Sequence, residues 1–166
     1  LLVVHRLDLE TSGVLCFARS RAAASRLCRA FREQTAAKRY VALVEGRVAT
    51  AAGVWRWPIA KARAATTSPP RYEAATDLPG RAAASTAKDA LTEWRVLGFE
   101  GNATRLELRP QTGRSHQLRV HCATAGHPVV GDPIYGRGQP GGRLCLHAAE
   151  LALPTHRRPF LAPVPF

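Results

Sequence analysis

The carboxylate of Asp8 lies in a stretch of sequence, residues 5–14, whose residue types could carry out chemistry. His5 and Arg6 precede it and Gly13 follows it, in a chain with 24 Lys and Arg against 12 Asp and Glu. A carboxylate can act as a nucleophile or a general base, and a neighbouring cation keeps it ionised. An aspartate in a turn more often accepts hydrogen bonds from its own backbone. We interpret Asp8 as a candidate catalytic residue, with a turn-forming role as the alternative.

A second stretch, residues 109–121, contains the cations that such a carboxylate would need. It includes Arg114, His116 and Arg119 and begins about a hundred residues after Asp8. A guanidinium beside a partly buried carboxylate keeps it ionised and can orient it through two parallel hydrogen bonds. We therefore predict that residues 5–14 and 109–121 form the two halves of one site.

Several function classes lack support because their motifs are missing. The sequence contains no P-loop, H-E-x-x-H or G-x-S-x-G motif, which disfavours P-loop nucleotide hydrolysis, zinc proteolysis and serine hydrolysis. His116 and His121 are five residues apart and would point to different faces of a helix, so no metal site is predicted. The four cysteines form no C-x-x-C pair, which favours reduced thiols in an intracellular compartment, either cytoplasmic or mitochondrial.

The charge of the chain indicates what it binds. A formal net charge of +12 and a pI near 10.9 are typical of a surface that meets polyanions, because each phosphate contact releases condensed counterions. No apolar run reaches the ~18 to 20 residues that a membrane-spanning helix needs. We expect a nucleic-acid partner and no membrane.

The hydrophobic pattern predicts an α+β domain with a mixed, largely antiparallel sheet flanked by helices. Asp8 is expected in a loop between two short strands, and Ser20 is expected to cap a helix that ends near Glu33. The arginines of that helix either form a solvated face or contact phosphate. Residues 61–88, which have few large apolar side chains, are expected to form a flexible insertion or loop. The other expected elements are strands at residues 1–4, 13–18, 40–46, 91–99, 104–108 and 143–153, and a helix at 115–125 that Gly126 terminates.

The length of the chain suits one domain. Its 166 residues are 46 % hydrophobic, which is enough to bury a core. The chain begins Leu1-Leu2-Val3-Val4 and contains no methionine. We therefore expect residues 1–166 to be a single domain that is incomplete at its N-terminus.

Three motifs resemble those of the RluA family of pseudouridine synthases. They are H-R-L-D-x-x-T-S-G at residues 5–13, G-R-x-H-Q-[IL]-R-x-H at 113–121 and G-H-P-x-x-G-D-x-x-Y-G at 126–136. Residues 38–46 and 146–148 resemble the family's K-x-Y-x-A-x-V-x-G and L-H-A strands. The family's upstream K-P-x-G segment is not present, and residues 61–88 match none of these motifs.

The resemblance implies the family's catalytic fold and the isomerisation of particular uridines in rRNA or tRNA to pseudouridine, without a cofactor. RNA would be the partner, alone or in a ribosomal assembly particle, and no DNA is expected. Asp8 would be the catalytic aspartate, acting as a nucleophile at the sugar or as a base at C2′. Arg119 would pair with Asp8 through a bidentate contact.

Five further residues receive roles from the same resemblance or from their neighbours. Tyr40 would stack on the target base, unless it faces the core from its strand. Arg6 would help to evert the uridine from its helix. Arg114 and His116 would hold phosphate, although a structural hydrogen bond is equally expected for His116. Asp132 is expected to be a turn former.

Two other functions compete with this hypothesis. One is a catalytically inactive RNA-binding or ribosome-assembly protein that retains the synthase fold. The other is a nuclease that uses His116 and His121, which has the basic charge as its support.

Overall fold

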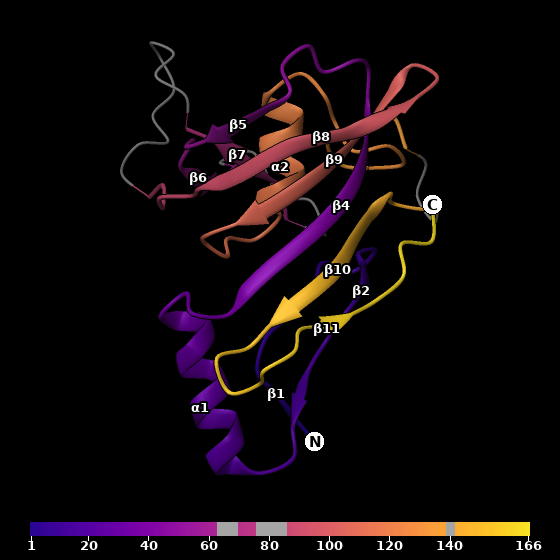
Figure 1. Cartoon of the computed structure of the whole chain (residues 1–166). Helices are drawn as coiled ribbons and strands as arrows, with labels where there is room; N and C mark the ends of the chain where they lie inside the picture. Colours follow the sequence, from indigo (N-terminus) through magenta and orange to yellow (C-terminus); the bar gives the residue numbers. More distant parts are fainter. Residues whose placement is uncertain (63–69, 76–85, 139–141) are drawn as a thin grey trace.

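The fold is built on a curved sheet of seven strands (Figure 1). The computed structural model describes residues 1–62, 70–75, 86–138 and 142–166. Neighbouring strands in the order β11-β10-β4-β9-β8-β5 are antiparallel, whereas β2 pairs with β10 in parallel. This arrangement confirms the predicted α+β class. The strands are β2 (Ser12–Gly13), β4 (Ala37–Glu45), β5 (Ala52–Trp55), β8 (Thr92–Glu100), β9 (Ala103–Pro110), β10 (Leu146–Ala152) and β11 (Phe160–Leu161).

Most predicted strands of this sheet match observed ones within a few residues, but the run at 13–18 is not one strand. Gly13 ends β2, and the chain then crosses to a separate antiparallel pair in which β3 (Phe17–Ala18) joins β1 (Leu2–Val3). The backbone turns at Gly13, whose φ is 116°. Asp8 lies between β1 and β2, in the loop position that the sequence predicts.

The predicted loop at 61–88 contains a strand that sequence analysis missed. Tyr72–Ala74 forms β7, which pairs with β6 (Ile59–Lys61). Ala74 is buried in a cluster with Ile59, Ala90 and Val120, and this packing fixes the strand despite the low complexity around it. Residues 63–69 and 76–85, the rest of the expected insertion, lie outside the described residues.

Two helices complete the described structure. The first, α1 (Arg21–Arg32), begins where predicted, since the Ser20 side chain accepts a hydrogen bond from the Ala23 amide at 3.2 Å. The second, α2 (Gln117–Thr124), starts two residues later than predicted. The reason is His116, whose φ of 54° lies in the left-handed region and cannot continue a right-handed helix.

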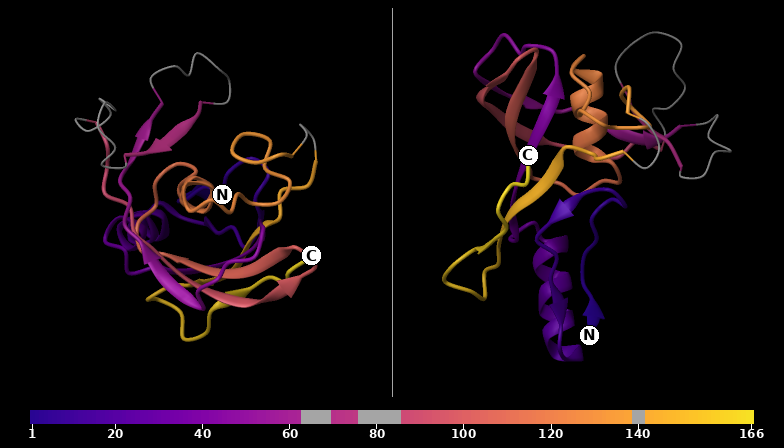
Figure 2. Two further views of the ribbon diagram at one scale, coloured as in Figure 1. Left: turned by 90° about the horizontal axis from the view of Figure 1, so that it is seen from above. Right: turned by 90° about the vertical axis from the view of Figure 1, so that its right-hand side faces the viewer.

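The main core lies between the concave face of the sheet and α2 (Figure 2). Alternate residues of β4 and β9 point to that face, including Ala42, Val44, Leu106 and Leu108, which are fully buried. Leu118 and Cys122 of α2 pack on them, and the β6–β7 pair covers the other side of the helix. Helix α2 is therefore held on both sides, which fixes the side chains at its N-terminal end.

Candidate active site

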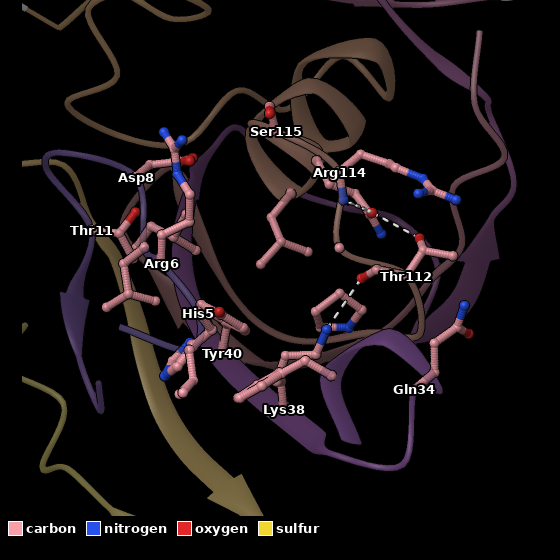
Figure 3. A pocket seen from close by; sticks show the side chains of 18 of the residues that line it. His5, Arg6, Asp8, Thr11, Gln34, Lys38, Tyr40, Thr112, Arg114 and Ser115 are labelled. Carbon is pink, nitrogen blue, oxygen red and sulfur yellow. Dashed lines mark hydrogen bonds between the residues drawn. The ribbon is translucent and has the colours of Figure 1, made fainter. Parts of the chain in front are cut away.

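A pocket of about 470 Å³ lies beside the N-terminal end of α2 (Figure 3). Its walls come from segments that are far apart in sequence: the loop of Asp8, the end of α1, strand β4 and the loop that follows β9. This volume suits a small organic group such as a nucleoside. The lining residues are Val4, His5, Arg6, Leu7, Asp8, Thr11, Phe31, Arg32, Gln34, Lys38, Tyr40, Pro110, Thr112, Gly113, Arg114, Ser115, Gln117, Leu118 and Leu146.

The loop that carries Asp8 is fixed at both ends. The backbone carbonyl of Asp8 accepts a hydrogen bond from the Thr11 amide at 3.0 Å, so Asp8 does lie in a turn. On the upstream side, the His5 ring stacks on Phe31 of α1 with 4.5 Å between ring centroids, and His5 Nε2 accepts from the Cys16 amide at 2.9 Å. These contacts give the carboxylate a rigid support.

Gly13 anchors the downstream end of the same loop against β10. A Cβ atom at Gly13 would lie 2.2 Å from the carbonyl oxygen of Ala148, and the φ of 116° is one that other residues rarely adopt. Next to it, the Ser12 hydroxyl lies 2.8 Å from Nδ1 of the buried His147. The Ser12-Gly13 part of the motif is therefore explained by the parallel pairing of β2 with β10.

Arg119 is the buried cation of the site, with 3 % of its side chain exposed. Its Nη1 lies 3.9 Å from Asp8 Oδ2, so the structure brings the two predicted residues together. The bidentate contact goes elsewhere, because Nε and Nη2 of Arg119 each donate a 2.7 Å hydrogen bond to the carboxylate of Asp132. The expectation that Asp8 accepts a bidentate contact is therefore wrong.

Asp132 has two roles, of which the sequence predicted one. Its Oδ1 accepts hydrogen bonds from the amides of Ile134 and Tyr135 at 2.9 and 3.0 Å, which confirms the turn. Burial alone would raise the pKa of Asp132, but the hydrogen bonds from Arg119 and from these amides hold that pKa below its ordinary value. Asp132 is thus a buried, ionised partner that orients the Arg119 guanidinium.

Tyr40 lies on β4 and lines the pocket from the concave face of the sheet. Burial, and secondarily the charge of Asp8, raise the pKa of Tyr40 to about 12. Its hydroxyl therefore stays protonated at neutral pH. The ring is partly buried against the main core, as the alternative expected, and also forms part of the pocket wall.

The three residues predicted to bind RNA occupy different places. Arg6 and Arg114 line the pocket, and Arg114 Nε donates to the carbonyl oxygen of Asp89 at 2.8 Å. His116 is not among the lining residues. Its Nδ1 lies 2.9 Å from the Tyr135 hydroxyl, and its ring meets those of Tyr72 and Tyr135 edge-on.

This environment gives His116 a structural role in addition to any contact with phosphate. Burial lowers the pKa of His116, and the nearby Asp8 charge opposes this effect. The Tyr135 ring also faces Arg119, with 5.3 Å from the ring centroid to the guanidinium carbon. The His116–Tyr135 pair therefore supports the buried cation from the side away from the pocket.

Sequence analysis missed Lys38 and Gln117 as residues of the site. Gln117 fixes the loop after β9, because its Oε1 accepts from the Thr112 hydroxyl at 2.7 Å and from the Arg114 amide at 3.0 Å. Lys38 lines the pocket two residues before Tyr40. Period-two alternation along a strand could have placed Lys38 on the same face as Tyr40.

The described residues contain neither a cluster of metal ligands nor a membrane-spanning helix. No group of three or more His, Cys, Asp or Glu side chains there is placed to hold a metal ion. Helices in this part of the chain are too short or too polar to cross a membrane.

Comparison with known proteins identifies the family. The RNA pseudouridylate synthase family matches residues 1–124. The chain belongs to this family. Dual-specificity RNA pseudouridine synthase RluA of Haemophilus influenzae is 40 % identical over 156 residues, which cover 92 % of the chain. RNA pseudouridylate synthase domain-containing protein 1 of Danio rerio is 38 % identical over 98 % of the chain.

Solved structures of pseudouridylate synthase proteins have the same fold. The human RNA pseudouridylate synthase domain containing 1 superposes with a TM-score of 0.84 at 35 % identity and covers 99 % of the chain. These comparisons confirm the RluA-type resemblance predicted from the motifs. The chain spans 66 % of the length of the H. influenzae relative and 56 % of the D. rerio relative.

Proposed function

We propose that the protein is an RNA pseudouridine synthase that isomerises particular uridines of rRNA or tRNA, with Asp8 as the catalytic carboxylate. One observation carries the proposal: Asp8 lines a nucleoside-sized pocket and lies 3.9 Å from a buried arginine. The H. influenzae relative is named a dual-specificity RNA pseudouridine synthase, and the D. rerio relative is named for its RNA pseudouridylate synthase domain, which supports the same reaction class.

The reaction breaks the N1–C1′ bond of uridine and forms a C5–C1′ bond in its place. In one route, Asp8 bonds to C1′ while the N1–C1′ electron pair leaves with uracil. In the other, Asp8 removes the C2′ proton as the same pair leaves. Uracil then turns and C5 bonds to C1′, while the Asp8–C1′ bond breaks in the first route or a proton returns from Asp8 to C2′ in the second. The C5 proton is then lost and N1 gains a proton. The overall change is an isomerisation that needs neither an oxidant nor an energy source.

The neighbours of Asp8 support both routes. Arg119 places a buried positive charge 3.9 Å from the Asp8 carboxylate, and Asp132 holds the guanidinium so that one nitrogen faces Asp8. The protonated Tyr40 offers its ring as a stacking surface for the base. Arg6, at the exposed rim of the pocket, is placed to enter the space that an everted nucleotide leaves.

Release of tritium from RNA that carries C5-labelled uridine tests the proposal. Separate rRNA and tRNA transcripts are used as substrates, and wild-type protein is expected to release tritium from at least one. Asp8→Asn should abolish release and leave RNA affinity nearly unchanged, because the amide keeps the shape and loses the reactive charge. Glu93→Gln, an exposed change on β8, is the control and should retain full activity.

Other outcomes would point to a different function. RNA binding without tritium release by wild-type protein would favour an inactive RNA-binding or ribosome-assembly protein. Full activity of Asp8→Asn would refute the assignment of the carboxylate.

A further inference from the structure

Lys38 is a cation of the pocket that the roles given above do not use. It precedes Tyr40 by two residues on β4, so the two side chains share a face and their backbones are about 7 Å apart along the strand. Both residues line the pocket. In Figure 3, Lys38 and Asp8 lie on different sides of this pocket.

The Lys38 ammonium is held in position by the loop after β9. Its Nζ donates to the carbonyl oxygen of Thr112 at 3.3 Å. That loop is itself rigid, since the Thr112 hydroxyl accepts from the Leu91 amide at 3.0 Å and donates to Gln117 at 2.7 Å. Gly113 lies beside the ammonium, since a Cβ added there would be in ordinary van der Waals contact with Nζ at 3.8 Å.

The ammonium has no carboxylate partner within salt-bridge distance among the described residues. Asp8 is the sole carboxylate among the described residues that line the pocket, whereas four lining residues are Lys or Arg. Burial of a cation beside a neutral carbonyl is unfavourable, and it lowers the pKa of Lys38. Negative charge in the pocket would offset this cost.

One step of the proposed reaction creates negative charge on the base. When the N1–C1′ bond breaks, the electron pair leaves with uracil, and the charge spreads from N1 to the O2 and O4 carbonyl oxygens. A base stacked on Tyr40, with its sugar at Asp8, directs an edge toward the neighbouring position on β4. That position is Lys38.

We propose that Lys38 is a catalytic residue that donates a hydrogen bond to a carbonyl oxygen of the departing uracil and stabilises its negative charge. This inference rests on the proposed function. Lys38 keeps its proton throughout: the negative charge of uracil is consumed when its electron pair forms the C5–C1′ bond, and the C5 proton then leaves to solvent or to another base while N1 gains a proton. Fixed donors aimed at developing charge are a large source of rate acceleration, and loss of one costs about 10²–10³ in kcat.

Binding of free bases tests the charge preference without turnover. The probes are uracil, which is neutral, 5-nitrouracil, which is more acidic and is used at a pH where it is an anion, and uridine 5′-monophosphate. The chain has three lysines, so the ¹³C-labelled ε-methylene resonance of Lys38 can be assigned by substitution. In wild-type protein, 5-nitrouracil should shift that resonance and bind at least about tenfold more tightly than uracil. Lys38→Met should abolish this preference, and Lys61→Met, an exposed change on β6, should leave it intact.

Kinetics with C5-tritiated RNA supply the second measurement. Lys38→Met should lower kcat about 10²-fold with little change in KM, and Lys38→Arg should restore part of the loss. Thermal unfolding of each variant checks that the fold is kept, and Lys38→Gln replaces Lys38→Met if the latter does not fold.

Three results would overturn the assignment. If Lys38→Met weakens the binding of uracil and of 5-nitrouracil equally, Lys38 has a packing role. If Lys38→Met weakens the binding of uridine 5′-monophosphate alone, Lys38 binds phosphate. An unchanged kcat would remove the catalytic role while leaving the synthase function intact. Absence of tritium release from wild-type protein would instead refute the proposed function, with the base-binding preference still measurable.

Discussion

Arg119 joins two carboxylates, donating two 2.7 Å hydrogen bonds to Asp132 and turning its remaining nitrogen, Nη1, to Asp8 at 3.9 Å. The shorter contacts are made by the two nitrogens that do not face Asp8. Asp132 therefore determines the orientation of the guanidinium, and Asp8 stays available to substrate.

Replacement of Asp132 by Asn should destabilise the protein and slow catalysis. It leaves Arg119 buried without its ionised partner, and breaking a buried pair in this way costs about 3–5 kcal/mol. Unfolding in guanidinium chloride at pH 7 measures the loss of stability, and single-turnover tritium release measures the catalytic rate. Asp89→Asn, an exposed change, is the control. A variant as stable and as active as wild type would contradict this role.

The stabilising effect of Asp132 should also depend on pH. The pKa of this carboxyl is lowered in the folded protein, because hydrogen bonds from Arg119 and two amides outweigh the opposing effect of burial. The contribution of ionised Asp132 to the free energy of unfolding is therefore complete above the ordinary carboxyl pKa of about 3.9. This contribution is lost as the pH falls below that value. The stability difference between wild type and Asp132→Asn should shrink between pH 5 and about pH 3 in unfolding experiments. A difference that does not vary with pH would contradict ionisation of Asp132.

Replacement of Gly13 by Ala should loosen the loop of Asp8. The added Cβ would collide with the Ala148 carbonyl oxygen, and the positive φ adds strain of about 1–3 kcal/mol. We expect lower stability and a lower kcat, measured by thermal unfolding and tritium release. Gly98→Ala is the matched control, since a Cβ at Gly98 has no heavy atom within 4 Å. Equal effects of the two substitutions would show that the contact with β10 is unimportant.

His121 should make the protein sensitive to mild acid. This fully buried ring lies 2.9 Å from the Trp57 carbonyl oxygen and 2.9 Å from the Thr92 hydroxyl, and burial lowers its pKa. The folded protein holds it neutral, whereas the unfolded chain takes up a proton below about pH 6.5. The contribution of neutral His121 to the free energy of unfolding is therefore complete above about pH 6.5. It decreases as the pH falls, by up to about 1.4 kcal/mol per pH unit.

Unfolding in urea at pH 7.5 and pH 5.5 checks this expectation. Burial also lowers the pKa of His5 and His116, so the test is the difference between wild type and His121→Gln. The variant should lose less stability on acidification. The exposed His156→Gln should behave like wild type, and identical slopes for all three proteins would contradict the prediction.

The arginines of α1 should contribute to the salt dependence of RNA binding. Arg26 and Arg29 are exposed and take part in no ion pair within the described residues. If they contact phosphates, each substitution to Gln should reduce the slope of log K against log salt by about 1. Arg95→Gln is the control, because Arg95 is paired with Glu107. Unchanged slopes would indicate a solvated helix face.

The sequence predicts best what depends on local chemistry. Helix α1 was found because Ser20 caps it and its apolar residues recur with the helical period, and Asp8 was placed in its loop by the strands on either side. The contact of Arg119 with Asp132 was not found, since a turn aspartate and an arginine of a helix show no pattern that reveals their pairing.

The start of α2 and the strand β7 escaped prediction for a related reason. His116 adopts its left-handed conformation where its ring meets the side chains of Tyr72 and Tyr135, and β7 forms because Ala74 packs under α2. Both depend on tertiary contacts between segments distant in sequence. Period-two alternation along β4 could have placed Lys38 beside Tyr40, but its lack of a carboxylate partner among the described residues is visible only in the fold.

The parallel pairing of β2 with β10 joins residues that are 135 positions apart, as in the contact of Ser12 with His147. A nascent chain that has not yet made Leu146–Ala152 lacks the downstream anchor of the Asp8 loop. Closing so long a loop is slow and occurs late in folding. On the proposed function, catalytic competence should thus arise only after Leu146–Ala152 has been made and has paired with β2.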